Sequence, residues 1–430
     1  MSTTAAVPDR ARQFLAALRR RPGQALLGTA SLALFAVAVA LLWPPARAFY
    51  HARAAERAAE RWEFDEARAH LAVCLEIWPD SASIHFQAAR AARRAGKLDE
   101  AQEHLSRSQS LAGPSPRTDR EWALLRAERG EVEAVEDYLK RTVGPEDPDA
   151  PLVLEALARG YLRADRPSSL LESTALWLQA RPRDTHALYF RGLAFERLGD
   201  RGEAVAAFRE SAEADPDNAA ARLRLGELLL SQAAADEALP QFEAVRAKRP
   251  ADPAVLLGVA RCRRALGQAR EARDILDRLL ADRPDDARAL AEWGRLALAE
   301  GDAAGAEARL RRAVELAPDE REALHALIQS LRAQEDKRRA ADELEPRLRD
   351  LDDDLRRLGE LLRAVDREPR DPAPRTEAAR ICLRHGRKDE GLRWLASVLR
   401  LDPGYAPARE LLAAHVGEGG AGRKGKEPAP

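Results

Sequence analysis

The segment from Gly199 to Pro216, "GDRGEAVAAFRESAEADP", decides the fold of this chain because its pattern recurs along the sequence at a nearly fixed interval. Its small residue, Ala204, has counterparts at Ala67, Ala101, Val135, Leu170, Ala238, Ala272, Ala306, Ala340 and Gly391. The successive intervals are 34, 34, 35, 34, 34, 34, 34, 34 and 51 residues. A period of this length is typical of stacked supersecondary units, not of a single compact core.

Each unit predicts a helix, a turn, a second helix and a stop. A large apolar residue follows the small one by four positions, as at Phe208, and in seven units a proline such as Pro216 follows by twelve. Proline ends a helix because it lacks a backbone N–H and restricts the preceding residue. Six units carry a glycine that suits the left-handed turn between the two helices: Gly96, Gly130, Gly199, Gly267, Gly301 and Gly386. With 33% charged and 5% aromatic residues, the composition also favours an all-α fold.

This pattern resembles the tetratricopeptide repeat (TPR) family, closely over residues 185–318 and more weakly over residues 48–415. The resemblance implies a right-handed α-solenoid of about ten helical hairpins across residues 48–415. The 51-residue interval predicts an extra or extended helix near residues 350–370, and "YAPARELLAAHV" predicts a final capping helix. Residues 416–430 are expected to form a disordered tail.

Residues Gln24–Trp43 form an uncharged run of twenty residues, which as a helix would span about 30 Å. We expect an uncleaved transmembrane signal-anchor at 24–43, preceded by a basic segment at 1–23. The alternative is a cleaved leader with "ARA" at Ala46–Ala48 as its cleavage site. Five arginines between Arg10 and Arg21 favour a cytoplasmic N-terminus and a periplasmic solenoid at a bacterial inner membrane. The opposite orientation stays open because further arginines follow the run.

No nucleotide-binding, hydrolase or zinc-protease motif is present, so the chain is predicted not to be an enzyme and to need no cofactor. Cys74, Cys262 and Cys382 lie far apart and are expected to be buried thiols. Four histidines form two sets at the repeat spacing: His51 with His85, and His70 with His104. A bridged metal is conceivable there, but no further ligand recurs, so we predict ordinary helix-surface histidines and no metal site. The net charge of −1 argues against nucleic acid as a partner.

The TPR resemblance implies a concave groove lined by the first helix of each unit. The ninth position of these helices reads Glu56, Arg90, Leu124, Arg159, Leu193, Glu227, Arg261, Arg295, Gln329 and Arg380. Five arginines in ten positions exceed the one or two that composition would give. The candidate peptide-binding groove comprises Arg90, Arg94, Arg159, Arg163, Arg197, Arg261, Arg264, Arg295, Arg332 and Arg380. Arginine suits carboxylates, so this lining predicts an acidic peptide or a C-terminal carboxylate as ligand. The competing hypothesis is a solvated face whose arginines pair with glutamates of the same chain.

Together these features predict a membrane-anchored scaffold that binds partner proteins or peptides through its concave groove. The lipid bilayer would be a second partner through the N-terminal helix, and no small-molecule substrate is expected. The alternative is a non-catalytic assembly factor or subunit of an envelope polymer synthesis or secretion complex.

Overall fold

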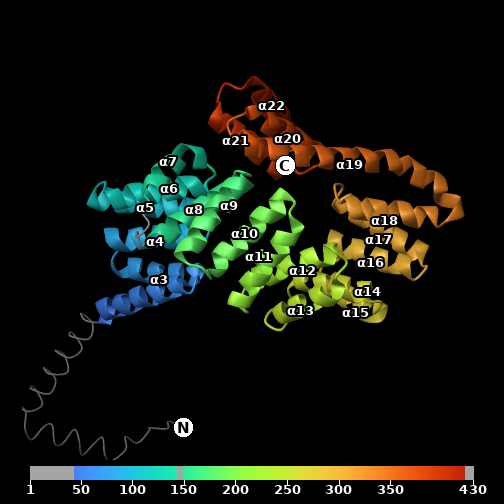
Figure 1. The fold of residues 1–430 in the computed structure, drawn as a ribbon, viewed down its shortest axis with the longest axis horizontal. Coiled ribbons are helices and arrows are strands. Elements are labelled where there is room, and N and C mark those ends of the chain that lie inside the picture. The colour runs from blue at the N-terminus through green and yellow to red at the C-terminus, as the bar shows by residue number, and fades with distance from the viewer. Residues whose placement is uncertain (1–42, 143–148, 422–430) are drawn as a thin grey trace, which may run out of the picture. The chain divides into compact units, whose positions relative to one another are not determined.

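The computed structural model describes residues 43–142 and 149–421, with side chains to residue 415, and these residues are helical with no β-strand. The helices form two compact units, which divide between Leu125 and Arg126. The all-α prediction is therefore confirmed over the described residues. Consecutive helices pair as hairpins within each unit, as the ribbon shows (Figure 1).

Unit 1 contains a first helix at 43–60, followed by α3 (Phe64–Ile77), α4 (Ala82–Arg94) and α5 (Leu98–Ala112). The next helix, α6 (Pro116–Glu128), crosses the boundary between the units. The core of the first hairpin consists largely of alanines from helix 43–60 and α3, together with Leu71 and Cys74. Small side chains allow the two helices to approach closely.

Unit 2 continues the series of hairpins with further helices. They are α7 (Val132–Thr142), α8 (Ala150–Arg163), α9 (Pro167–Ala180), α10 (Thr185–Leu198), α11 (Arg201–Ala214), α12 (Ala219–Ser231), α13 (Ala235–Arg246), α14 (Pro253–Ala265), α15 (Ala269–Asp282), α16 (Ala287–Ala299), α17 (Ala303–Leu316), α18 (Arg321–Arg332), α19 (Arg338–Arg367), α20 (Pro372–Arg384), α21 (Lys388–Leu401) and α22 (Ala406–Ala421). A 3₁₀ turn, Glu335–Lys337, precedes α19. Even-numbered helices from α4 to α20 are the first helices of their repeats, and odd-numbered ones from α3 to α21 are the second.

The quoted segment behaves as its pattern predicts. Gly199 adopts the left-handed conformation with φ +83°, and the carboxylate of Asp200 accepts a hydrogen bond from the backbone N–H of Glu203 at the start of α11. Ala204 and Phe208 are completely buried, and α11 ends two residues before Pro216. All six predicted turn glycines have positive φ, between +76° and +86°. The turn glycines and the helix-ending prolines thus mark the helix boundaries in the repeats that contain them.

Aromatic and glycine residues of neighbouring helices fit together along unit 2. Phe242 of α13 lies between Gly226 of α12 and Gly258 of α14, so close that a Cβ at Gly258 would meet its ring at 2.3 Å. Gly192 leaves the same space for Phe208. These glycines are therefore required by close packing inside helices, not by backbone conformation.

Four repeats differ in detail from the others. Trp62, Asp165 and Ala233 take the left-handed turn position with φ of 63°, 51° and 61°, although none is glycine. In the ninth repeat the buried alanine is Ala341, whereas the predicted Ala340 is only half-buried. The 3₁₀ turn just before α19 explains this shift, because its three residues per turn rotate the following side chains relative to an α-helix.

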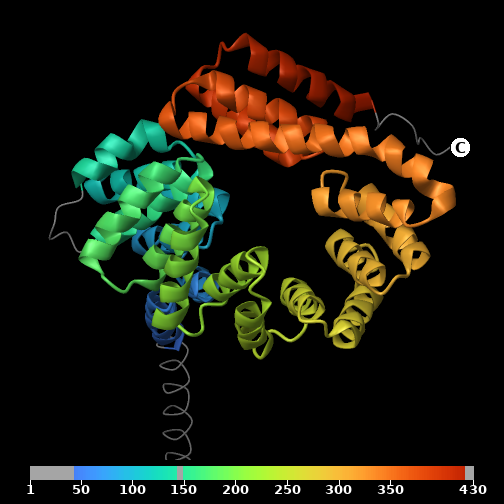
Figure 2. The same cartoon turned by 45° about the vertical axis from the view of Figure 1, so that its right-hand side comes forward.

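The long 51-residue interval is occupied by α19, a single helix of 30 residues (Figure 2). It extends the second helix of the ninth repeat by about four turns. α22 follows the tenth repeat and runs to Ala421, so it includes the first residues of the predicted tail, whose remainder lies outside the described residues.

The predicted basic segment and transmembrane helix at 1–43 lie, apart from Trp43, outside the described residues. Within the part of the chain that the structure describes, none of the helices combines the length and the apolar character needed to cross a bilayer.

Candidate partner-binding surface

The first helices of successive repeats pack against one another along unit 2. α8 contacts α10, α12 contacts α14, α14 contacts α16, and α16 contacts α18. No two second helices in the described part of unit 2 are in comparable contact. Since the first helices approach each other more closely, they lie on the inner side of the curvature in this run of repeats. The side chains that these first helices expose on the inner side form the candidate surface.

Four charged residues on α14, α16 and α18, namely Arg264, Glu292, Arg295 and Glu322, form what we call the arginine–glutamate ladder. Glu292 is completely buried at its centre and accepts a hydrogen bond from Nε of Arg264 at 2.5 Å. Arg295 binds the second carboxylate oxygen of Glu292, and its Nη1 donates to Glu322 at 2.5 Å. The ladder therefore ties three consecutive first helices together.

Charges within the arginine–glutamate ladder stabilise one another. Burial tends to lower the pKa of Arg295, but the attraction of Glu292 and Glu322 outweighs this and raises it. Burial likewise tends to raise the pKa of Glu322, while Arg295, with Arg261 and Arg321, lowers it. A buried pair of this kind is costly to break, because removing one partner leaves an uncompensated charge. Arg264 and Arg295 thus have a structural role whatever else they bind.

Three further predicted arginines also pair with carboxylates of the same chain. Arg159 of α8 lies 3.0 Å from Glu155 one turn earlier. Arg197 pairs with Asp165, and Arg332 pairs with Glu345, so each joins its own helix to a neighbouring segment. These contacts agree with the competing hypothesis of intrachain pairing at these positions.

Arg90 and Arg94 belong to unit 1 and stack on aromatic rings. The guanidinium carbon of Arg94 lies 4.2 Å from the ring centre of Phe64 and 4.5 Å from that of Trp62. The guanidinium of Arg90 is 6.0 Å from Phe86. Cation–π contacts of this kind hold the arginine in place without cancelling its charge.

Arg163 of α8 lies close to two arginines of α21, Arg393 and Arg400, and all three side chains are exposed. We call them the arginine cluster. A Cβ at Gly130 would lie 3.5 Å from both Cδ of Arg163 and Nη2 of Arg400. Among the described side chains, none of the three forms an ion pair. Partial burial lowers the pKa of Arg163, and Arg393, Arg159 and Arg400 lower it further against the opposing attraction of Glu128.

Sequence reasoning missed Arg393 and Arg400. Both lie on a second helix, whereas the groove register considers first helices only. The seven-residue spacing between them, which places both on one face of α21, is the signal that could have drawn attention to them.

Arg261 and Arg380 complete the predicted set. Neither forms an ion pair with a described side chain. The charge of Arg261 acts on Glu322 at one end of the arginine–glutamate ladder, and that of Arg380 acts on Glu377 of the same helix. These two positions are half-buried and exposed, respectively.

The three cysteines are buried free thiols, as expected. Burial raises the pKa of Cys74, and it raises the pKa of Cys262 to about 12 and that of Cys382 to about 11. These thiols are therefore protonated at neutral pH, and they pack as small apolar side chains.

The histidines differ from the prediction of ordinary surface residues, because they meet within hairpins. Nδ1 of His51 lies 2.8 Å from Nδ1 of His70, and the same atoms of His85 and His104 are 3.0 Å apart. The repeat spacing predicted equivalent positions for histidines of successive repeats, but it could not show that both helices of one hairpin turn a histidine toward each other. Among the described residues, no group of three or more histidine, cysteine or acidic residues could hold a metal ion.

Comparison with protein families explains the periodicity. Two tetratricopeptide repeat profiles match the chain, one at residues 170–219 and 189–253 and the other at residues 229–291. The chain carries tetratricopeptide repeats. The resemblance read from the sequence is thereby confirmed. A search of curated proteins found no match to this sequence.

Several solved structures are similar to parts of the chain. A MamA fragment (residues 41 to the end) from Desulfovibrio magneticus RS-1 is 23% identical, with a TM-score of 0.37, and the match covers 40% of this chain and 97% of that one. PilW, a type IV pilus biogenesis factor, is 22% identical with a TM-score of 0.41 over 46% of this chain and 91% of its own. A human IFIT1 dimer with m7Gppp-AAAA is 15% identical with a TM-score of 0.40 over 75% and 90%, respectively. At these identities and TM-scores, the similarities say nothing about what this chain binds.

Proposed function

We propose that this protein is a membrane-anchored scaffold that binds an acidic segment of a partner protein through exposed arginines of its repeats. Tetratricopeptide repeats are generally non-catalytic interaction scaffolds, and the family matches support that general role here. The proposal adds two specific claims to this general role: that the protein is anchored in the membrane, and that its partner is acidic. The observation that carries the acidic partner is the arginine cluster.

The arginine cluster differs from the arginine–glutamate ladder in its charge balance. Within the ladder, Glu292 and Glu322 already neutralise the two arginines, and an incoming carboxylate would have to compete with them. In the cluster, Arg163, Arg393 and Arg400 have no ion pair with any described side chain, and the charges of Arg393 and Arg400 help to lower the pKa of Arg163. An acidic side chain or a C-terminal carboxylate would relieve this repulsion and could accept bidentate hydrogen bonds. Arg261, which forms no ion pair with a described side chain, is a separate candidate contact beside the ladder.

A labelled decaglutamate peptide tests the acidic partner directly. We expect fluorescence anisotropy to show binding to the full-length protein in detergent, and we expect added salt to weaken it. The triple charge reversal Arg163→Glu, Arg393→Glu and Arg400→Glu should weaken binding at least tenfold. The single reversal Arg261→Glu tests the predicted groove in the same assay, because Arg295 is needed to neutralise the buried Glu292.

A matched control is available on α19, where Arg339, Arg349 and Arg356 are exposed. Reversing these three charges changes the net charge equally but leaves the cluster intact. Equal weakening by the control and cluster variants would show a nonspecific charge effect and would contradict the proposed site.

The membrane part of the proposal rests on the uncharged run at residues 24–43 and the arginines before it. We propose a cytoplasmic N-terminus and repeats on the periplasmic side of a bacterial inner membrane. A reporter active on only one side of the membrane, fused after Pro430, tests this orientation. Activity of a cytoplasmic reporter at that position would overturn it, and loss of the protein from the membrane fraction in buffer without salt would argue against the anchor.

A further inference from the structure

Large apolar side chains are exposed at the beginning of helix 43–60. Trp43 is 68% exposed, and Phe49 and Tyr50 are each 62% exposed. They are the three most exposed of the large hydrophobic residues in the described part of the chain. Aromatic side chains rarely remain this exposed in water without a partner, because burial of each would remove a large apolar surface from water.

The opposite side of this helix is already covered. Ala48, Ala55 and Ala58 are buried against α3, and the thiol of Cys74 donates a hydrogen bond to the backbone oxygen of Ala48 at 3.3 Å. Trp43, Tyr50 and Arg57 follow one another at seven-residue spacing, which places them along one line of the helix, away from the alanines. The helix therefore has one side packed against the rest of the repeat and an opposite side that is exposed.

Arginines accompany the aromatic residues on this face. Arg47, Arg53 and Arg57 are exposed, and the guanidinium of Arg53 lies 5.6 Å from the ring centre of Phe49. Two of these arginines have acidic neighbours: Arg53 lies 3.6 Å from Glu56, and Arg47 lies 4.0 Å from Glu76. Aromatic rings with arginines beside them are typical of helices that lie in the interface of an anionic bilayer.

The position of the uncharged run at residues 24–43 indicates that the partner of this face is the lipid bilayer. That run ends at Trp43, so in the proposed anchor Trp43 would stand at the boundary of the hydrocarbon core. We infer that helix 43–60 lies along the membrane surface, with its face of Trp43, Arg47, Phe49, Tyr50, Arg53 and Arg57 in the headgroup region of anionic lipids. This inference rests on the anchor of the proposed function and specifies how the first repeat meets the bilayer.

Helix dimensions favour a flat orientation over an upright one. Tyr50 is seven residues beyond Trp43, about 10 Å along the axis, whereas the headgroup layer on each side is about 5–7 Å thick. An upright helix would leave Phe49 and Tyr50 in water, and a flat one places both in the interface. Pro44 and Pro45 allow the change of direction, because neither has a backbone N–H to continue hydrogen bonding from a preceding helical segment.

The test uses full-length protein reconstituted in vesicles of phosphatidylcholine and phosphatidylglycerol. Single cysteines replace Phe49 or Arg57 and carry a bimane label, and Ser106→Cys on the exposed side of α5 is the matched control. The native cysteines are buried, and labelling of the unsubstituted protein measures their background. Lipids with a nitroxide on the headgroup should quench the labels at 49 and 57 at least twofold more than the label at 106.

The outcomes separate this inference from the anchor. Protein that floats with the vesicles while the labels at 49 and 57 are quenched no more than that at 106 would overturn the surface orientation and leave the anchor intact. Quenching at 49 without quenching at 57 would show that the helix leaves the interface before Arg57 and would also overturn it. Protein that fails to float would contradict the anchor and this inference together.

A second variant tests the role of the aromatic residues. In the Arg57→Cys protein, the substitutions Phe49→Ser and Tyr50→Ser should reduce headgroup quenching at position 57 while the protein still floats. Replacing phosphatidylglycerol by phosphatidylcholine should reduce it as well, because the arginines then lose their anionic partners. Unchanged quenching in both experiments would show that these side chains do not hold the helix on the lipid.

Discussion

Ser168 and Asp366 are joined by two hydrogen bonds although 198 residues separate them in the sequence. The backbone N–H of Ser168 donates to Oδ1 of Asp366 at 3.1 Å, and the hydroxyl group of Ser168 donates to Oδ2 at 2.6 Å. Asp366, at the end of α19, therefore caps α9, whose own N-cap residue makes no side-chain cap. Nearby, buried Arg375 of α20 lies 3.5 Å from Glu133 of α7. Within unit 2, side chains of α19 and α20 thus bind the early helices α9 and α7.

Replacing Asp366 by alanine should loosen the start of α9. Loss of a carboxylate cap costs about 1 kcal/mol, so we expect hydrogen exchange in the first turn of α9 to accelerate about fivefold. Asp353→Ala is a suitable control, because Asp353 is an exposed residue of the same helix whose ion-pair partner, Arg356, lies one turn away. Acceleration in both variants, or in neither, would contradict a specific cap.

Gly258→Ala should destabilise unit 2, because the new Cβ would overlap the ring of Phe242 at 2.3 Å. Overpacking of this kind costs about 1–3 kcal/mol. Gly359→Ala is the matched control: Gly359 lies inside α19, and a Cβ added there would meet no atom within 4 Å, so alanine should stabilise the helix by about 0.5–1 kcal/mol. Thermal unfolding of the two variants should therefore shift in opposite directions, and a shift in the same direction would refute the packing argument.

Much of the fold follows from the sequence because the same local signals recur in each repeat. Turn glycines such as Gly199 and helix-ending prolines such as Pro216 act on their immediate neighbours, so the pattern alone locates them. Ala233 shows the limit, since it takes the left-handed turn without the residue that normally signals it. There, packing of the flanking helices overrides the local preference.

The candidate surface was less predictable because many of its contacts join residues that are distant in the sequence. The repeat register identified arginines on first helices, including Arg264 and Arg295. The pairing of Arg295 with Glu292, one turn earlier on the same helix, is a local pattern, but the contacts of Arg264 with Glu292 and of Arg295 with Glu322 become apparent only when neighbouring helices pack. Likewise, the proximity of Arg163 to Arg400 depends on contact between distant repeats of unit 2, which no local pattern encodes. The spacing of residues in the sequence predicts which face of a helix they share. Which of their charges are neutralised can be seen only in the tertiary structure.

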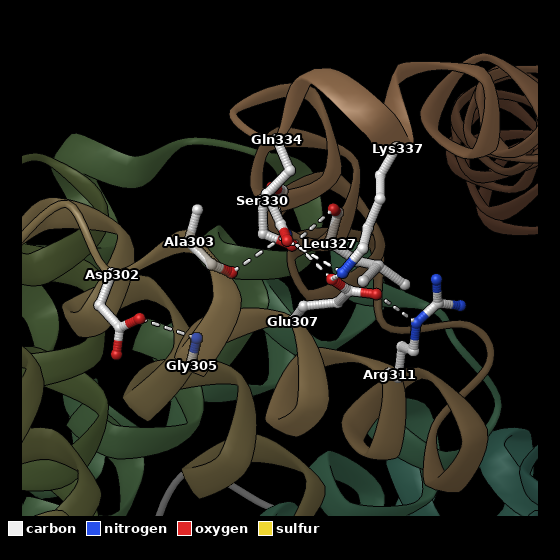
Figure 3. A network of polar contacts seen from close by, with 9 residues as sticks. All are labelled: Asp302, Ala303, Gly305, Glu307, Arg311, Leu327, Ser330, Gln334 and Lys337. Carbon is white, nitrogen blue, oxygen red and sulfur yellow. Dashed lines mark hydrogen bonds and ion pairs between the residues drawn. The ribbon is translucent and has the colours of Figure 1, made fainter.

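Glu307 should make unit 2 sensitive to strong acid. Its carboxylate accepts hydrogen bonds from Lys337 at 2.6 Å, Gln334 at 2.9 Å and Arg311 at 2.9 Å (Figure 3). Burial opposes ionisation, but these bonds outweigh it and lower the pKa of Glu307 to about 2 from its usual 4.5. The contribution to stability is therefore complete above pH 4.5 and is lost as the pH falls toward 2.

Comparison of the wild type with Glu307→Gln measures this contribution. The variant should melt at a lower temperature at neutral pH, and the difference should shrink as the pH falls below 4.5. Glu343→Gln, at an exposed position of α19, controls for the loss of one charge. A melting difference that is independent of pH would show that Glu307 acts through its shape alone.

The two histidine pairs should weaken unit 1 at a milder pH. Each hydrogen bond between Nδ1 atoms requires that one of them be unprotonated, so double protonation of a pair breaks it. For His51, partial burial and the neighbouring His70 and Arg47 lower the pKa below 6.5 against the attraction of Glu76. For His104, burial, His85 and Arg68 lower the pKa against the attraction of Glu100 and Glu103.

Because the pKa values of His51 and His104 are lowered on folding, these groups contribute stability above pH 6.5 that is lost as the pH falls below it. We expect the melting temperature of the wild type to fall between about pH 7.5 and about pH 5.5, and the double variant His51→Gln and His104→Gln to lose part of that dependence. His325→Gln, at an exposed residue of α18, should leave the pH dependence unchanged. A double variant that follows the wild-type profile throughout this range would exclude the histidine pairs as its source, since no other change distinguishes the two proteins.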